Sequence, residues 1–503
     1  MDERRDFGIR LSAAVYALFI ALTLVLALAF SHWDYAYKRV AAPNLLLLPL
    51  GLLFLLLLTL CLRRAEGKRI DALVLVLAPL LLLVQLVCVR AYYFRTGWDV
   101  ELVLQSAFDL ARGLPTEGGT YYSLYPNNLL LVYLLAKALR LAFWLGFTEE
   151  RAYLLLLGLC CLGYLAASLL VYFVTARLSG HRAAGLWAYL VCFLLAGLSP
   201  WLSIPYSDTL GLVFPVGTLA LWLLRPEKRL TRLLRSFALG AWAMLGYRLK
   251  PQLIIVLIAV ILLEGERTLR HRAGRGWPER AAALLAGLLS AALAAGAMTA
   301  SLGFTLEKEK QIGPTHFWMM GLNEPFNGGF YLEDSEFSAS FDTRAERTAA
   351  DLERAGERLQ AMGAGGLVRH TVKKQLTNFN DGTFAWACEG LYDGGFFKTL
   401  RDAEGEKLAE ILRGIYYTDG PRFALWCGAE QALWLAVLTL SLCAAWGCRE
   451  RGTAGLLLAL FGVGLFSLLF EARARYLFAY APLFVAAAAL GAERLREKVN
   501  SEQ

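Results

Sequence analysis

The sequence has no arrangement of cysteine and histidine residues that is typical of a metal site or a disulfide framework. It contains nine cysteines and only five histidines. Most of the cysteines lie inside apolar segments, where a thiol behaves as a small hydrophobic side chain. The sequence also has no internal repeat and no low-complexity tract beyond its leucine-rich runs. These absences argue against a zinc-binding module and against a small disulfide-stabilised domain.

Hydrophobic residues dominate the composition. They make up 57% of the 503 residues, and the mean hydropathy is +0.49; soluble domains contain about 45–50% apolar residues. Apolar runs recur at about the 17–25 residues needed to cross a bilayer. The net charge of +8 does not indicate a nucleic-acid partner, because Lys and Arg gather in short loops between apolar runs. The sequence therefore predicts an all-α polytopic protein of the plasma membrane, in contact with membrane lipids.

The apolar runs predict about 12 to 13 membrane-spanning helices. The expected spans are 11–30, 43–62, 70–90, 128–145, 152–176, 183–200, 208–224, 233–247, 251–264, 281–303, 424–446, 454–470 and 477–492. The run 128–145 is the one least expected to span fully, because Lys137 and Arg140 interrupt it.

Basic loops are expected on the cytoplasmic side of the membrane. This rule places 91–127, the turn near Lys250, 304–423 and 471–476 outside. The predicted regions are N-terminal helices (1–90), a first catalytic outer loop (91–127), a transmembrane core (128–303), one soluble extracytoplasmic loop of about 120 residues (304–423), and C-terminal helices with a cytoplasmic tail (424–503).

Two carboxylates, Asp99 and Glu101, follow the third apolar run in the sequence Trp98-Asp99-Val100-Glu101. Charges beside a membrane are costly unless they serve a function. Asp99 is predicted to accept a proton from an acceptor hydroxyl, and Glu101 to hold Asp99 or help bind a divalent cation, Mg²⁺ or Mn²⁺. The alternative is that both stabilise the first turn of a helix through its dipole.

Two polar segments each precede an apolar run. Tyr125, Asn127 and Asn128 belong to the first and Asp208 to the second. We expect these side chains to contact substrate. Helix capping is the alternative for the two asparagines and for Asp208.

Four cations are expected to face outward, although positively charged residues usually lie on the cytoplasmic side of a membrane. Arg248 and Lys250 flank one turn, and Arg473 and Arg475 follow Glu471 in another. A phosphate at the membrane surface needs such charges, so all four are predicted to bind a donor phosphate. The alternatives are snorkelling towards lipid headgroups for the first pair and a structural ion pair with Glu471 for the second.

The expected outer loop contains further polar candidates. His316, Asn323 and Asp334 are predicted to bind substrate, with packing as the alternative for His316. The loop is expected to contain one helix over 342–362 and another over 367–376, separated by the glycine-rich stretch 363–366.

Taken in order, these motifs resemble those of GT-C-type integral membrane glycosyltransferases. The resemblance is strongest to the branch that holds protein O-mannosyltransferases and lipid A aminoarabinose transferases. It is carried by Trp98-Asp99-Val100-Glu101, Tyr125-Pro126-Asn127-Asn128, Arg248-Leu249-Lys250-Pro251, and Glu471 to Tyr476 with Pro482 downstream. It covers about 91–303 and 424–492.

The resemblance implies an inverting hexosyl- or pentosyltransferase. The donor would be a polyprenyl-phosphate sugar, the acceptor a hydroxyl of an extracytoplasmic glycan, lipid or protein, and the base Asp99. The chain departs from the usual layout, because its acidic loop follows the third span rather than the first. Two other functions stay open: a lipid-linked sugar flippase or transporter, which should carry ionisable residues at mid-span, and a structural partner in envelope assembly.

Overall fold

The protein is built almost entirely of helices. The computed structural model describes residues 7–31, 42–62, 67–92, 94–95, 97–116, 118–271, 276–386, 398–399 and 407–502. The first half contains α1 (Phe7–Ala29), α2 (Asn44–Leu62), α3 (Lys68–Tyr92), α4 (Trp98–Arg112), α5 (Gly119–Leu124), η2 (Pro126–Asn128), α6 (Leu129–Trp144), α7 (Glu149–Ser179), α8 (Arg182–Cys192), η3 (Phe193–Gly197), η4 (Pro200–Ser203), α9 (Ser207–Leu210), α10 (Val213–Leu223) and α11 (Arg229–Leu249).

The second half continues the same architecture. It contains η5 (Pro251–Ile254), α12 (Ile255–His271), α13 (Trp277–Ala300), η6 (Lys308–Lys310), α14 (Pro314–Met320), α15 (Leu332–Ala339), α16 (Arg344–Phe379), α18 (Lys407–Tyr416), α19 (Phe423–Cys443), α20 (Arg451–Leu469), α21 (Arg475–Phe478) and α22 (Ala481–Glu502). Within the described residues, the strands are the two-residue antiparallel partners β1 (Phe94–Arg95) and β2 (Lys398–Thr399). The all-α class is therefore confirmed.

Every expected apolar run coincides with a described helix or pair of helices. Seven of the described helices are long and apolar enough to cross a membrane: α1, α2, α3, α7, α13, α19 and α20. The others are shorter or more charged, as in the two apolar stretches Arg182–Gly197 and Ser207–Leu223. Helix α6 has 16 residues, a length of roughly 24 Å, which is less than the thickness of the hydrocarbon core. The protein is a multi-pass membrane protein, and its described residues contain seven full-length apolar helices, against the 12 to 13 spans expected.

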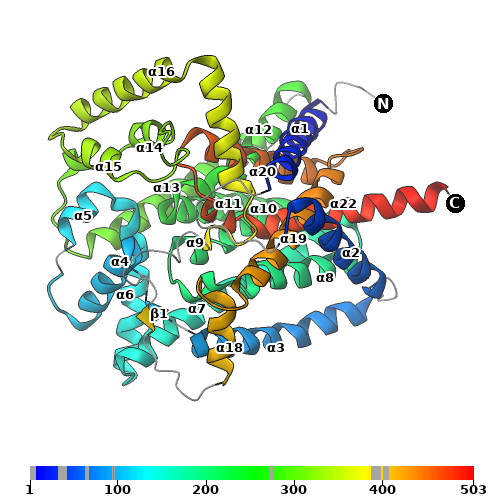
Figure 1. Cartoon of the computed structure of the whole chain (residues 1–503), viewed down its shortest axis with the longest axis horizontal. Coiled ribbons are helices and arrows are strands. Elements are labelled where there is room, and N and C mark those ends of the chain that lie inside the picture. The colour runs from blue at the N-terminus through cyan, green and yellow to red at the C-terminus, as the bar shows by residue number, and fades with distance from the viewer. Residues whose placement is uncertain are drawn as a thin grey trace.

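The bundle has a buried centre and an apolar outer surface. Helices α19 and α20 are mostly buried and pack against α1, α2, α12 and α22 (Figure 1). Helices α2, α3 and α13 expose most of their apolar side chains, as lipid-facing helices do. Helices α11 and α13 pack closely because Gly240 and Gly287 face the partner's backbone, where a Cβ atom would collide with a carbonyl oxygen.

The segment 304–423, expected to be one soluble loop, is divided in the structure. Helices α14 and α15 and the first part of α16 form a small unit beside α4 and α5 (Figure 1). Helix α16 then bends at Gly363, whose φ of 57° and ψ of −175° are not helical. This break confirms the two helices expected on either side of the glycine-rich stretch.

The second part of α16 enters the bundle. The Phe379 ring lies 5.5 Å from that of Phe19, and the Trp434 indole donates a hydrogen bond of 2.8 Å to the Phe379 carbonyl. Residues 376–386 are buried. The described part of 304–423 therefore does not confirm the expected single soluble unit of about 120 residues.

Candidate active site

Three of the predicted site residues meet although they come from separate segments. Asp208 lies in α9, Lys250 joins α11 to η5, and Arg475 begins α21. The Lys250 ammonium is hydrogen-bonded and ion-paired to Asp208 Oδ1, and Arg475 Nε lies 3.5 Å from Asp208 Oδ2. The Asp208 side chain is 1% exposed, and those of Lys250 and Arg475 are 13% and 11% exposed. We call these three residues the cation cluster.

Aromatic rings enclose the cation cluster. The Arg475 guanidinium lies 4.3 Å from the centre of the Trp98 ring, and Lys250 Nζ lies 4.4 Å from that of Tyr476. The Tyr206 ring meets Trp98 edge-on, with 5.2 Å between the centroids. Such rings attract cations through their quadrupole, most strongly where water is excluded. They attract the two cations without neutralising their charge.

Trp98 connects the cation cluster to the predicted base. Its φ is +45°, a left-handed conformation that is strained for a bulky residue. Asp99 follows it in the first turn of α4, and its side chain is exposed. Burial raises the pKa of Tyr125 to about 12, and the negative charge of Asp99 adds to that rise. Asp99 therefore lies near the Tyr125 segment. Its place in the first turn of α4 also fits the alternative that it stabilises the helix through its dipole.

Glu101 does not share a face with Asp99. The two residues lie two positions apart in one helix, so their side chains point to different sides. Glu101 is half-buried, whereas Asp99 is exposed. The described residues contain no group of three or more His, Cys, Asp or Glu side chains that could hold a metal ion. This geometry does not support joint binding of one Mg²⁺ or Mn²⁺ by Asp99 and Glu101 alone.

The asparagines after Tyr125 form side-chain hydrogen bonds, Asn128 with two tyrosines and Asn127 with Asn128, and Asn128 does not cap a helix. Asn128 lies at the N-cap of α6, but its side chain makes no capping hydrogen bond. Asn128 Nδ2 instead donates to the Tyr121 hydroxyl at 2.7 Å, and the Tyr206 hydroxyl donates to Asn128 Oδ1 at 3.4 Å. Asn127 Nδ2 lies 3.4 Å from the same oxygen. These hydrogen bonds connect the Tyr125 segment to Tyr206, which is next to the cation cluster.

Capping is also the wrong explanation for Asp208. The N-cap of α9 is Tyr206, and the Asp208 carboxylate is directed to the cations. The remaining predicted cations, Arg248 and Arg473, are both half-buried and lie in the last turn of α11 and just before α21. Glu471 accepts a hydrogen bond of 2.8 Å from the Tyr476 hydroxyl.

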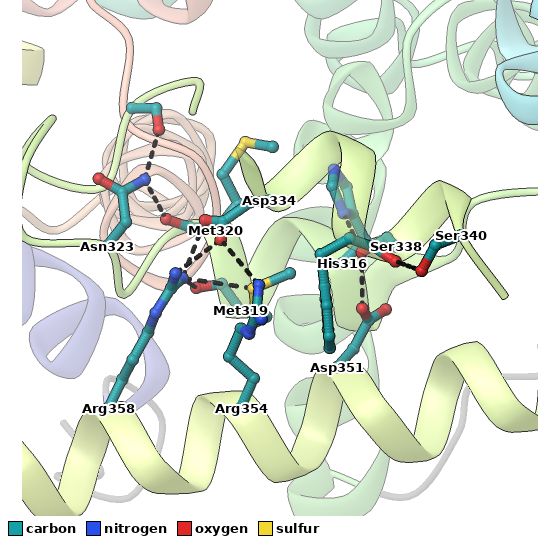
Figure 2. A network of polar contacts seen from close by, with 12 residues as sticks. His316, Met319, Met320, Asn323, Asp334, Ser338, Ser340, Asp351, Arg354 and Arg358 are labelled. Atoms are coloured by element: carbon teal, nitrogen blue, oxygen red, sulfur yellow. Dashed lines mark hydrogen bonds and ion pairs between the residues drawn. The ribbon is translucent and has the colours of Figure 1, made fainter. Parts of the chain in front are cut away.

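The other predicted residues, His316, Asn323 and Asp334, lie in the α14–α16 unit, where Figure 2 shows each of them bonded to other residues of that unit. Asp334 is fully buried and accepts two hydrogen bonds from Arg358, of 2.6 and 2.9 Å. Asn323 donates to the carbonyls of Met320 and Gly329. These bonds stabilise the fold of the unit, and we assign neither Asp334 nor Asn323 to the candidate active site.

His316 belongs to a hydrogen-bonded row with Ser338 and Asp351. The Ser338 hydroxyl donates to Asp351 Oδ1 at 2.6 Å, so it accepts from His316 Nδ1, 2.7 Å away. This order differs from that of a hydrolase triad, in which histidine lies between the nucleophile and the acid. Burial lowers the pKa of His316 to about 4. The packing alternative therefore fits His316 better than substrate binding.

Lys374 is a structural residue that the sequence did not reveal. Its ammonium is buried and donates to the carbonyls of Gly321, at 2.7 Å, and Phe470, at 2.6 Å. A backbone hydrogen bond of 2.7 Å from Ala472 to Gly328 lies beside it. Lys374 thus joins the α14–α16 unit to the segment that carries Glu471 and Arg475. Its surroundings are backbone carbonyls from distant positions, for which a sequence has no signal.

The aromatic partners of the cation cluster were also missing from the predicted site. Trp98 directly precedes Asp99, Tyr206 lies two residues before Asp208, and Tyr476 follows Arg475. The sequence signal for these rings was an aromatic residue within two positions of Asp99, Asp208 and Arg475. Trp201, whose ring centre lies 6.0 Å from the Arg475 guanidinium, offered no such signal.

The fold and the cluster define a polytopic, all-α integral membrane protein with charged and aromatic side chains gathered where several helices begin or end. The chain belongs to the family described as "conserved hypothetical integral membrane protein", which matches residues 6–495.

Two solved structures are similar to the chain. One is the archaeal oligosaccharyltransferase AglB from Archaeoglobus fulgidus in complex with an inhibitory peptide and a dolichol-phosphate, at 14% identity over 84% of this chain and 51% of that one, with a TM-score of 0.42. The other is the apo form of the Archaeoglobus fulgidus oligosaccharyltransferase, at 16% identity over 87% and 52%, with a TM-score of 0.44. The chain spans about half the length of either protein. No curated protein sequence matches it.

Proposed function

We propose that the protein is a membrane glycosyltransferase of the GT-C type. It transfers a hexose or pentose from a polyprenyl-phosphate donor to a hydroxyl of an extracytoplasmic glycan, lipid or protein at the cell envelope. The observation that supports this proposal is the meeting of Lys250 and Arg475 beside Trp98, which directly precedes Asp99. A base next to two buried cations is the arrangement that displacement of a phosphate requires.

The donor phosphate binds to the cations. Lys250 and Arg475 carry two positive charges against the one negative charge of Asp208, so the cation cluster retains an excess positive charge. Lysine has three N–H donors and arginine five, and one carboxylate cannot accept all of them. Arg248 and Arg473 lie within two residues of these cations and add positive charge at the rim.

The reaction is a single displacement with inversion. The acceptor oxygen attacks the anomeric carbon while the carboxylate of Asp99 takes its proton. The bond between the anomeric carbon and the phosphate oxygen breaks, and the polyprenyl phosphate leaves with the bonding electrons. Lys250 and Arg475 stabilise the negative charge that develops on that oxygen. Tyr125, Asn127 and Asn128 lie on the Asp99 side and contact the sugar or the acceptor. No step is assigned to a divalent cation.

The test is sugar transfer in membranes that contain the full-length protein. A radiolabelled polyprenyl-phosphate hexose is supplied to wild type, to Asp99→Asn and to Asp109→Asn. Asp109 lies on the same helix and accepts a hydrogen bond of 2.9 Å from Gln105, so its replacement is a matched control. We expect Asp99→Asn to reduce transfer at least about a hundredfold, and Asp109→Asn to leave it unchanged.

Two results contradict the proposal. Equal transfer by wild type and Asp99→Asn removes Asp99 from the reaction. Movement of the labelled lipid across the membrane without transfer, for several donor sugars, identifies a flippase instead.

A further inference from the structure

Asp208 has no surface left for a substrate. Its side chain is 1% exposed, and its two oxygens face Lys250 and Arg475. A group that binds a sugar hydroxyl must present an oxygen to the site, and Asp208 presents both of its oxygens to cations. Its contribution must therefore act through those cations.

We propose that Asp208 is the positioning residue of the candidate phosphate site, whose buried carboxylate fixes Lys250 and Arg475 side by side and keeps Lys250 charged. The proposal rests on the proposed function, because it assigns the role of Asp208 to donor-phosphate binding. It differs from the expected direct contact between Asp208 and the substrate.

The position of each cation depends on Asp208. Lys250 follows α11 and Arg475 begins α21, and these elements lie far apart in the sequence. Each cation has an aromatic face on one side, Tyr476 for Lys250 and Trp98 for Arg475. A ring lets a cation slide across its face, whereas a carboxylate fixes direction and distance. Among the ion pairs of the described residues, Asp208 is the carboxylate that both cations share.

The charge of Lys250 also depends on Asp208. Burial lowers the pKa of Lys250, and the positive charge of Arg475 lowers it further. Asp208 opposes this shift through its charge and its hydrogen bond, and Glu471 opposes it more weakly. Without Asp208, a buried ammonium faces a second cation and loses its proton at a lower pH. A neutral Lys250 attracts phosphate much less.

The test measures binding of a short-chain polyprenyl phosphate to the purified full-length protein in detergent micelles. Binding is measured at about pH 7 and about pH 9, where the phosphate monoester is mostly dianionic. The variants are Asp208→Asn, the double variant Asp208→Asn/Lys250→Arg, and Asp351→Asn. Asp351 is a buried carboxylate of the α14–α16 unit and is therefore the matched control.

We expect the wild-type dissociation constant to change less than about threefold between the two pH values. For Asp208→Asn, the affinity falls about tenfold at the higher pH, because Lys250 becomes neutral. The double variant loses this pH dependence, because arginine stays protonated throughout the range. Asp351→Asn follows wild type.

The contrary results are distinct. An equal loss for Asp208→Asn at both pH values assigns Asp208 a purely structural role, and unchanged binding at both removes it from the phosphate site. Either result overturns the inference while leaving the proposed function intact. Failure of the wild-type protein to bind polyprenyl phosphate at both pH values overturns the proposed function and the inference together.

Discussion

Two buried aspartates each face two cations, but their partners come from different places. Asp334 is bound by Arg358 and lies 3.8 Å from Arg354, and both arginines come from α16. Asp208 is bound by Lys250 and Arg475, which come from separate parts of the chain.

The two sites also differ in the groups that contact their cations. Arg358 makes two hydrogen bonds to Asp334 and donates a third, of 2.8 Å, to the Met319 carbonyl. The cations at Asp208 are paired with that carboxylate and also lie against aromatic rings. A local, fully bonded ion pair stabilises a fold, whereas a long-range cluster with excess positive charge is suited to binding an anion.

The largest expected effect on stability comes from removing the ion pair between Asp334 and Arg358. Asp334→Ala leaves two arginines without their buried counter-ion, which costs about 3–5 kcal/mol of local stability. Hydrogen exchange of the amides in the first part of α16 measures this cost as faster exchange. Binding of polyprenyl phosphate to the protein that remains folded should be unchanged. A loss of binding in this variant would mean that the two sites act together.

The next effect concerns how the stability of the α14–α16 unit depends on pH. The pKa of His316 is about 4 in the folded protein because the ring is buried, against about 6.5 when unfolded. Below about pH 6.5 the unfolded state binds a proton that the folded state does not, so stability falls as the pH drops towards 4. The shift corresponds to about 3 kcal/mol. Protonation would also add an N–H at Nε2, a buried atom for which the described part of the chain provides no hydrogen-bond partner.

The measurement compares wild type with His316→Asn by hydrogen exchange of α14–α16 between about pH 7 and about pH 4. Carboxylates titrate in both proteins, so the difference between the two pH profiles isolates His316. Parallel profiles would exclude this residue as the source of acid sensitivity.

A smaller effect is expected when the arginine of each site is replaced by lysine. Arg475→Lys keeps the charge but loses the planar group that lies over Trp98, so the affinity for polyprenyl phosphate should fall about tenfold. Arg358→Lys loses the two-point bond to Asp334 and should change only the exchange rates of α14–α16. Equal binding by wild type and Arg475→Lys would place the phosphate elsewhere.

The smallest effect is expected at the start of α16. Thr343 Oγ1 accepts a hydrogen bond from Glu346 N, and Glu346 Oε2 accepts one from Thr343 N. Thr343→Ala should destabilise this helix start by about 1 kcal/mol and leave sugar transfer unchanged. Protection of the amides at 344–347 measures the change, and Ser340→Ala is a nearby control outside the cap.

The sequence predicted helices well because a long apolar run encodes its own membrane-compatible structure. It also predicted the break at Gly363, because successive glycines interrupt a helix locally. It did not predict that residues 374–386 are buried. Their polar side chains resemble those of a soluble loop, and their partners, such as the Phe470 carbonyl for Lys374, lie far along the chain.

The candidate site was predicted as separate motifs rather than as an arrangement. Membrane sidedness placed Lys250 and Arg475 on one face, but the pairing of both with Asp208 depends on how α9, α11 and α21 pack. The left-handed backbone at Trp98 has no signature either, since tryptophan rarely adopts it. The roles of the individual residues in transfer stay predictions.

The buried ammonium of Lys374 has a consequence for the order in which the protein assembles during synthesis. One of its acceptors, Gly321, precedes it in the chain, but the other, Phe470, lies 96 residues later. A charged side chain is not stably buried before its partners are present. The second part of α16 therefore completes its docking only after α20 has been synthesised. The segment that bears Arg475 follows directly, so the cation cluster is among the last parts of the protein to form.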